Sequence, residues 1–363
     1  MTVLRNSRVK CTNVLNSDLA AESPYPVLYL CLLSLSLSLS LSRRTYPVKI
    51  GWIGFHIEGL RALRSLLEQG VPIAAVITLK PELAAKRSGA VDYAALCQQF
   101  RVPLYEVANI NSPESVTLLS DLSLDVLFVI GWTQILRPPV LRTAKIGVIG
   151  AHASLLPHNR GRAPINWVLI NGEQQTGNSL MWLAEGVDSG DLIDQTVIPI
   201  TPYDTCASLY ERVAESNCDM ILRVLPRLLA GERPGHPQPH SHEALLPGRR
   251  PEDGRIDWTK SSQEVYAFVR ALTKPYPGAF SWLDGQRWGV WQCALLPGAC
   301  YPDTQPGQLV GPVFAPEEMA CGQVVACGTG AVILLELERE DGVLLWGRRL
   351  SDQSWTGKVW TNE

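Results

Sequence analysis

The sequence predicts an α/β protein with a mostly parallel sheet, followed by a smaller β-rich domain. Three observations support this prediction. Apolar, strand-like runs alternate with helical repeats over residues 48–229, and a stretch rich in Pro, Gly, His and Arg follows. Beyond it, short strand patterns are separated by turn residues. Alternating strands and helices are typical of a parallel sheet, whereas closely spaced short strands are typical of an antiparallel sheet or barrel.

Each element of the first region has its own signal. Residues 49–55 form a continuous apolar run that predicts a buried strand. Residues 59–69 repeat leucine at helical spacing, and Gly70 ends that helix. The same reasoning predicts further strands over 71–78, 102–105, 125–130, 147–151 and 179–183, and helices over 93–100, 115–122 and 208–229. Sheets of this kind bind ligands beyond the carboxyl ends of their strands.

The second region begins after a linker with little apolar periodicity. A helix is predicted over 263–272, and short strands over 279–283, 288–294, 323–326 and 331–336. We expect these strands to form a small, partly open barrel. The predicted organisation is an extension (1–46), an α/β domain (47–232), a linker (233–252), a β-rich domain (253–345) and a tail (346–363).

Composition limits the function classes. The formal net charge is −3, so no overall basic field would hold RNA or DNA, and any phosphate binding must be local. The nine cysteines form no CxxC pair and no zinc-type spacing. Scattered cysteines in odd number indicate free thiols in a reducing compartment. We therefore expect a cytoplasmic protein without a metal.

The first 46 residues differ from the rest, because residues 34–42 read SLSLSLSLS. Three interpretations are open: a non-native extension, which we favour, a disordered tail, and a membrane or export segment. The half-serine composition is weak for a spanning helix, and no cleavage site follows, so we expect no membrane association.

The chemistry-bearing residues concentrate in residues 147–191. A polar stretch punctuated by Pro and Gly directly after an apolar strand is where an α/β protein places its site. His152 is the natural acid/base or electrostatic catalyst, because imidazole titrates near neutral pH. Asp188, at a Gly-bounded turn, would orient that imidazole. From the residues alone, a hydrogen-bonded structural histidine remains the more common alternative.

Two strings in this stretch carry a family resemblance: HASLLPHNRGRAP at 152–164 and DSG at 188–190. They resemble the formyltransferases that use 10-formyltetrahydrofolate. The string RGRAPINWVLINGE at 160–173 most resembles the sugar-nucleotide formyltransferases of that family, such as the one acting on UDP-4-amino-4-deoxyarabinose. Residues 255–258 (RIDW) and 275–282 (PYPGAFSW) resemble its C-terminal domain. The resemblance implies a Rossmann-like sheet followed by an OB-like domain.

The resemblance also implies roles for individual residues. An amine attacks the formyl carbon of 10-formyltetrahydrofolate, His152 stabilises the oxyanion, and Asp188 helps to remove the proton, with no metal involved. A loop beside the pterin would include Gln134, Ile135 and Leu136, with Gly186 and Val187 opposite. Arg160, Arg162 and Asn166 would bind the acceptor, the arginines by clamping a diphosphate. The plainer alternatives are core packing for Ile135 and Leu136 and solvated or paired arginines.

One position departs from the family pattern. The family has Asn two residues before the histidine, where it donates to the formyl oxygen, and this sequence has Gly150. Three outcomes are open: Asn159 or Gln134 replaces the donor, the enzyme works more slowly on His152 alone, or the protein only binds ligand. We favour an active enzyme, because the histidine and the aspartate remain.

Several functions therefore compete. The favoured one is an amine formyltransferase acting on an amino sugar nucleotide. A methionyl-tRNA formyltransferase is the alternative within the family. Its β-rich domain should carry a basic face for tRNA, and the mixed charge of residues 255–345, with several acidic side chains, argues mildly against that. A non-catalytic folate- or nucleotide-binding protein is a third possibility, and a homodimer is left open. An NAD-dependent oxidoreductase is disfavoured, because residues 51–59 (GWIGFHIEG) lack the GxGxxG spacing.

Overall fold

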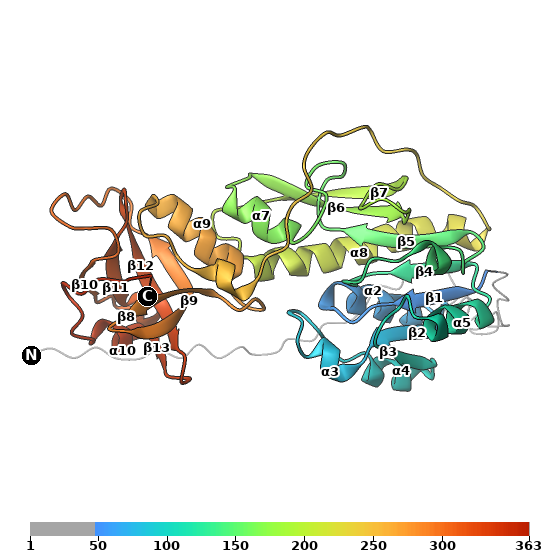
Figure 1. Ribbon diagram of the computed structural model, residues 1–363, viewed down its shortest axis with the longest axis horizontal. Helices are drawn as coiled ribbons and strands as arrows, with labels where there is room; N and C mark the ends of the chain where they lie inside the picture. The colour runs from blue at the N-terminus through green and yellow to red at the C-terminus, as the bar shows by residue number, and fades with distance from the viewer. Residues whose placement is uncertain (1–47, 363) are drawn as a thin grey trace, which may run out of the picture. The chain divides into compact units, whose positions relative to one another are not determined.

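The computed structural model describes residues 48–362, so the extension expected over residues 1–46 lies outside the described residues. A seven-stranded sheet of order β3-β2-β1-β4-β5-β6-β7 forms the first part of the chain (Figure 1). Its first five strands run parallel, and the last two are antiparallel to their neighbours. The strands are β1 (Ile50–Ile53), β2 (Ile73–Leu79), β3 (Leu104–Val107), β4 (Val126–Val129), β5 (Gly147–His152), β6 (Gln175–Trp182) and β7 (Leu192–Pro199).

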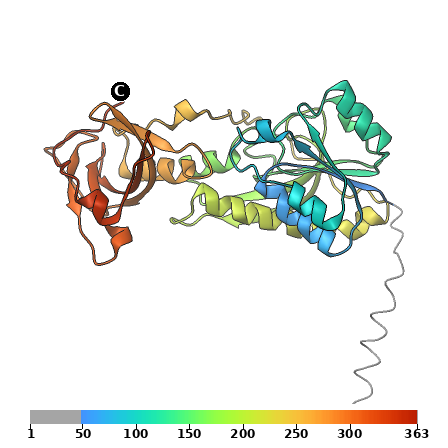
Figure 2. The ribbon, with the colours of Figure 1, turned by 90° about the horizontal axis from the view of Figure 1, so that it is seen from below.

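Helices cover both faces of this sheet. Strand side chains alternate between faces, so Ile50 and Trp52 of β1 join one core cluster and Ile53 joins another. The first cluster packs against α2 (Ile57–Glu68) and α8 (Cys206–Leu229), which lie side by side (Figures 1 and 2). The remaining helices of this part are α3 (Pro81–Ala84), α4 (Ala94–Phe100), α5 (Pro113–Asp121), α6 (Pro138–Leu141) and α7 (Pro164–Ile170). The expected Rossmann-like, mostly parallel sheet is confirmed.

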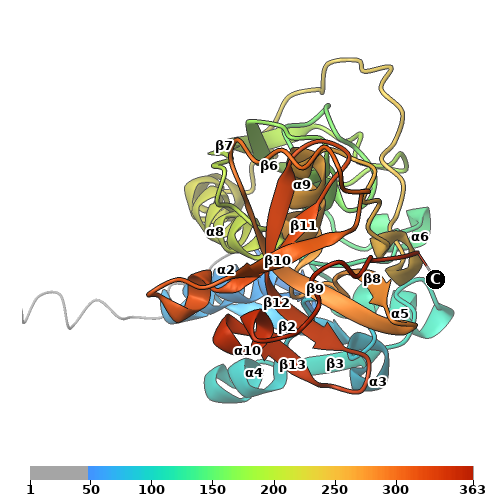
Figure 3. The same ribbon diagram turned by 90° about the vertical axis from the view of Figure 1, so that its left-hand side faces the viewer.

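The second sheet is antiparallel and has the order β10-β11-β12-β9-β8, with β13 pairing to β12 (Figure 3). Its strands are β8 (Ala279–Leu283), β9 (Gln286–Leu295), β10 (Leu309–Val313), β11 (Gly322–Ala326), β12 (Ala331–Arg339) and β13 (Leu344–Trp346). They are accompanied by α9 (Ser262–Leu272), α10 (Gly347–Ser351) and two short 3-10 turns, η1 (Pro251–Gly254) and η2 (Glu318–Ala320). The expected β-rich C-terminal domain is confirmed.

The expectation of a tail over residues 346–363 is corrected by the structure. Trp346 completes β13, and α10 begins at the next residue. Further along, Trp355 and Trp360 are buried, and Thr361 pairs through its backbone with Trp282 of β8. The last residues of the chain therefore contribute buried apolar side chains to the core of the C-terminal domain.

A long segment without regular helices joins the two parts. We call residues 233–250 the strap; in Figure 1 it is part of the extended segment between α8 and α9. The backbone of His236 pairs with Leu192 of β7, and Leu246 pairs with the backbone of Arg160 and Arg162. The strap is thus tied along its length to the first sheet and its loops. Within residues 48–362, no helix is long and apolar enough to cross a membrane.

Candidate active site

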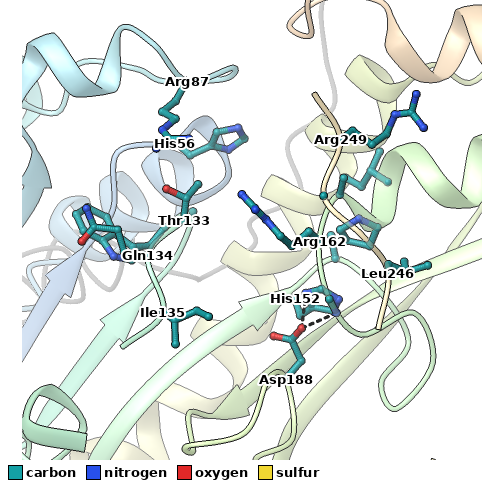
Figure 4. A pocket seen from close by; sticks show the side chains of 18 of the residues that line it. His56, Arg87, Thr133, Gln134, Ile135, His152, Arg162, Asp188, Leu246 and Arg249 are labelled. Atoms are coloured by element: carbon teal, nitrogen blue, oxygen red, sulfur yellow. Dashed lines mark hydrogen bonds and ion pairs between the residues drawn. The ribbon is translucent and has the colours of Figure 1, made fainter. Parts of the chain in front are cut away.

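His152 is the last residue of β5, between β4 and β6. Only 9% of its surface is exposed, so its imidazole is held in place by protein. Nε2 lies 2.9 Å from the backbone oxygen of Asn159, in the loop after the strand. Nδ1 lies 3.6 Å from Oδ2 of Asp188, on the turn that follows β6 (Figure 4). The two residues expected to work together are therefore adjacent.

Asp188 adopts a conformation that is unusual for a residue with a side chain. Its φ is +48°, in the left-handed region. The backbone N–H of Gly161 donates to Oδ2 at 2.9 Å. Oδ1 has no hydrogen-bond partner among residues 48–362. Oδ2 thus accepts a hydrogen bond from the protein, whereas Oδ1 is available to accept one from a ligand.

The loop between β5 and α7 serves both catalytic candidates. It presents the carbonyl of Asn159 to His152 and the N–H of Gly161 to Asp188. Its own hydrogen bonds fix it, because Ser154 Oγ donates to the backbone oxygen of His158 at 2.7 Å. Asn159 itself has a φ of +55°, which turns its carbonyl toward the histidine side of the loop. The SLLP and RG strings of the sequence therefore form a preorganised frame for the pair.

The pair opens onto a cavity of about 1290 Å³. Three apolar side chains on its lining are notably exposed, Ile135 at 70%, Leu245 at 48% and Val187 at 39%. Ile135 belongs to the loop after β4, and Figure 4 shows it on the wall opposite Arg162. Exposed apolar side chains in a cavity lose contact with water when a flat organic ligand enters. Gly186 also lines the cavity, and Leu136 lines it while being 7% exposed.

The side chain of Gln134 anchors the loop that carries Ile135. Its Nε2 donates to the backbone oxygen of Ala108, and its Oε1 accepts from the N–H of Ile110, both at 2.8 Å. The Gln134 amide is therefore already occupied. The backbone of the loop is anchored too, because Asn111 donates to the backbone oxygen of Ile135 and accepts from the N–H of Arg137, both at 2.8 Å.

The cavity carries more positive than negative charge. Glu58 and Asp188 are the acidic side chains on its lining. Its cationic side chains without an ion pair within residues 48–362 are Lys86, Arg87, Arg137, Arg162, Arg249 and Arg250. Figure 4 shows Arg162 directed into the space that faces His56 and Arg87. Arg160 lies differently: its Nη2 donates to the backbone oxygen of Ser241 in the strap, and it does not line the cavity. Its position gives no support to the phosphate role expected of it.

Asn166 also lies in a different setting from the one expected. It is fully buried, and its Nδ2 donates to the backbone oxygen of Ala271 at 2.6 Å, which ties α7 to α9. Its Oδ1 is buried without a partner among the described residues. Although Asn166 contributes to the cavity lining, its amide holds two helices together.

The position of the missing family asparagine is filled by a hydrocarbon side chain. A Cβ built at Gly150 would lie 2.5 Å from Cδ2 of Leu183. The suggested replacement donors are engaged elsewhere, because Asn159 Nδ2 faces the carboxylate of Glu173 at 3.3 Å and the Gln134 amide is anchored as described. Both amide nitrogens are therefore already engaged with other groups of the protein.

The cavity also has aromatic walls that the sequence did not reveal. The ring of His56 lies 5.3 Å from that of Tyr210, and the hydroxyls of Tyr210 and Tyr276 are hydrogen-bonded to each other. Burial holds the pKa of both phenols well above the usual range. His56 is the N-cap of α2, Tyr210 belongs to α8, and Tyr276 lies in the loop after α9. The three are distant in sequence, so no local sequence pattern predicts that they meet.

Two protein-family models match this chain. The sequence matches the formyl transferase family over residues 58–225 and the formyl transferase C-terminal domain over residues 249–350. The chain belongs to the formyltransferase family. His152 and Asp188 both lie in the first matched range, and the family expected from the sequence motifs is confirmed.

Several solved structures share the fold. HypX from Aquifex aeolicus, in complex with tetrahydrofolic acid, matches with a TM-score of 0.58 at 17% identity, over 83% of this chain and 46% of HypX. This formyltransferase chain therefore spans about half of HypX. An N-formyltransferase from Helicobacter canadensis, in complex with folinic acid and dTDP-3-aminofucose, matches with a TM-score of 0.57 at 17% identity, over 79% and 98%. WlaRD, a sugar 3N-formyl transferase, matches with a TM-score of 0.56 at 16% identity, over 82% and 99%. At these identities the likeness establishes the fold.

Proposed function

We propose that this protein transfers the formyl group of 10-formyltetrahydrofolate to the primary amine of a nucleotide-linked amino sugar. The observation that carries the proposal is the His152–Asp188 pair, 3.6 Å apart, at the edge of a large cavity. Family membership supplies the reaction class, and the cavity supplies space for two reactants.

The folate would lie against the loop that carries Ile135. A pteridine is flat and apolar on its faces and has hydrogen-bonding groups along its edge. The exposed side chains of Ile135 and Val187 suit the faces, and the backbone of the same loop suits the edge. Gln134 would support this arrangement by anchoring the loop on Ala108 and Ile110.

The chemical step follows from the two side chains. The acceptor nitrogen forms a bond to the formyl carbon, and the carbonyl oxygen becomes an oxyanion. Because both ring nitrogens of His152 face protein acceptors, a protonated imidazole would stabilise the oxyanion through its charge. The open Oδ1 of Asp188 would take the proton from the amine, directly or through water. The bond from carbon to N10 of the folate then breaks, and the proton ends on N10.

The acceptor would be anionic. Arg162 and Arg87 bring to the cavity guanidinium groups that have no ion pair in the described part of the chain, and such groups bind phosphate oxygens well. Two sugar N-formyltransferases with the same fold, WlaRD and the Helicobacter canadensis enzyme, are consistent with an acceptor of this class.

Mass spectrometry would test the proposal directly. The protein is incubated with 10-formyltetrahydrofolate and a panel of amino sugar nucleotides beside methionyl-tRNA. We expect a mass gain of one formyl group on a sugar nucleotide, and loss of that product with His152→Ala. Formylation of methionyl-tRNA alone would transfer the assignment to the tRNA acceptor. Folate binding without any product would identify a non-catalytic binding protein.

A further inference from the structure

The side chain of Gln238, in the strap, donates hydrogen bonds to the turn that carries Asp188. Its Nε2 lies 2.9 Å from the backbone oxygen of Asp188 and 2.6 Å from that of Gly190. Gln238 is half-buried, while its neighbours Pro237 and Pro239 are exposed. One side-chain amide therefore binds two carbonyls that flank the catalytic turn.

The turn needs such support. A left-handed backbone is unfavourable for a residue with a side chain, and Asp188 has a φ of +48°. Gly161 holds the carboxylate end of Asp188, and Gln238 holds its carbonyl end. The direction of the carboxylate toward His152 thus depends on contacts from two segments that are distant in sequence.

The strap is itself well fixed near the catalytic loop. Glu243 contacts Nδ1 of His158 at 2.5 Å, and the Leu246 N–H donates to the backbone oxygen of Arg160 at 2.7 Å. The strap lies mainly between the two ranges that match the family, 58–225 and 249–350. Family membership therefore assigns no role to most of the strap, and any role must be inferred from the contacts that the strap makes.

We propose that Gln238 is a positioning residue for Asp188, and that the strap is part of the active site rather than a passive linker. The inference rests on the proposed function, because it assigns Gln238 a role through the catalytic carboxylate. Loss of the amide would let the turn relax and move the carboxylate away from the position next to His152. A displacement on the order of 1 Å in such a site can cost about 100-fold in rate.

The test is a double-mutant cycle with Gln238→Met, which keeps the side-chain length but removes the donor, and Asp188→Asn. We expect Gln238→Met to lower kcat about 10- to 100-fold with little change in KM for the acceptor. In the Asp188→Asn background the same change should cost less than about threefold, because both act through one group. Gln353→Met is the matched control, since Gln353 donates to the backbone oxygen of Arg349 far along the chain. We expect it to keep wild-type activity.

Hydrogen exchange gives a second readout that needs no activity. Gln238→Met should speed exchange at the two amides that donate to this turn, those of Gly161 (to Asp188 Oδ2) and Trp182 (to the Asp191 backbone oxygen), and leave those of β1 unchanged. Wild-type kcat in Gln238→Met, an equal loss in both backgrounds, or unchanged exchange at these two amides would each overturn the positioning role. If the wild-type protein forms no product while exchange responds as expected, the proposed function fails and the grip of Gln238 on the turn stands.

Discussion

The side chain of Leu183 occupies the space beside Gly150. A Cβ at position 150 would lie 2.5 Å from Cδ2 and 3.0 Å from Cγ of Leu183. Gly150 also pairs with Val129 on one side and Met181 on the other, so its backbone cannot move away. With Leu183 in this position, the packing leaves no room for an asparagine side chain at position 150.

Restoring the donor should consequently require two changes. We expect Gly150→Asn alone to bring little gain in kcat, because the new side chain meets Leu183. Gly150→Asn combined with Leu183→Ala should raise kcat about 10-fold or more, since one well-placed oxyanion donor can be worth about 100- to 1000-fold. Steady-state kinetics of both variants, with Leu183→Ala as the control, checks this. An equal rise in kcat with Leu183→Ala alone would show that the gain comes from wider access of substrate to the site and not from a new hydrogen bond.

The sequence predicted the part of the fold that local periodicity encodes. Residues 49–55 and 125–130 are apolar runs, and both became central parallel strands, β1 and β4. The edge strand β7 (Leu192–Pro199) was missed, because the polar residues Asp194, Gln195 and Thr196 interrupt its apolar sequence. The approach of His152 to Asp188 was expected from motifs, and the structure brings the two together.

Side-chain direction and long-range contact were beyond local patterns. Arg160 and Arg162 are two residues apart and looked equivalent, yet Arg160 is drawn to a strap carbonyl 81 positions away. The grip of Gln238 on Asp188 spans 50 positions in a segment that reads as a plain linker. Such contacts depend on where the chain returns after a whole domain, and neither hydropathy nor spacing records that.

The two arginines offer a matched pair of variants. Arg162→Ala should raise KM for a phosphorylated acceptor about 10- to 100-fold, the worth of one charge-assisted hydrogen bond, with a smaller effect on kcat. The loss should shrink at high salt as the remaining field is screened. Arg160→Ala should leave KM for the acceptor unchanged, because its guanidinium is bound to Ser241 outside the cavity. Kinetics with the product-forming sugar nucleotide measures both. Equal effects of the two substitutions would argue against a phosphate contact at Arg162.

Acid sensitivity should depend on Asp204, just before α8. Burial opposes its charge, but hydrogen bonds from Arg212, Thr201 and Ser208 outweigh that and hold its pKa well below the usual range. A carboxyl group with a lowered folded-state pKa stabilises the protein above its unfolded-state pKa of about 4, and the contribution is lost as the pH falls through the folded-state value. Asp204→Asn should cost about 2–3 kcal/mol of unfolding free energy at pH 7, and progressively less below about pH 4.

Urea unfolding of wild type and Asp204→Asn at several pH values measures that difference. Asp194→Asn is the control, because the Asp194–Arg223 pair is far more exposed and should be worth less than about 1 kcal/mol. A difference between wild type and Asp204→Asn that stays constant down to about pH 2 would contradict the assignment.

The last residues of the chain should be essential to the second domain. Trp360 is 2% exposed, and its ring lies 6.3 Å from that of Trp258 and 6.2 Å from that of Trp355. Trp360→Ala removes a large buried side chain and should cost about 3–5 kcal/mol, measured by urea unfolding followed by circular dichroism. Trp346→Ala is the control, since Trp346 is 40% exposed and its loss leaves no cavity of that size. If Trp360→Ala unfolds at the same urea concentration as Trp346→Ala, the end of the chain would be the dispensable tail that its sequence first indicated.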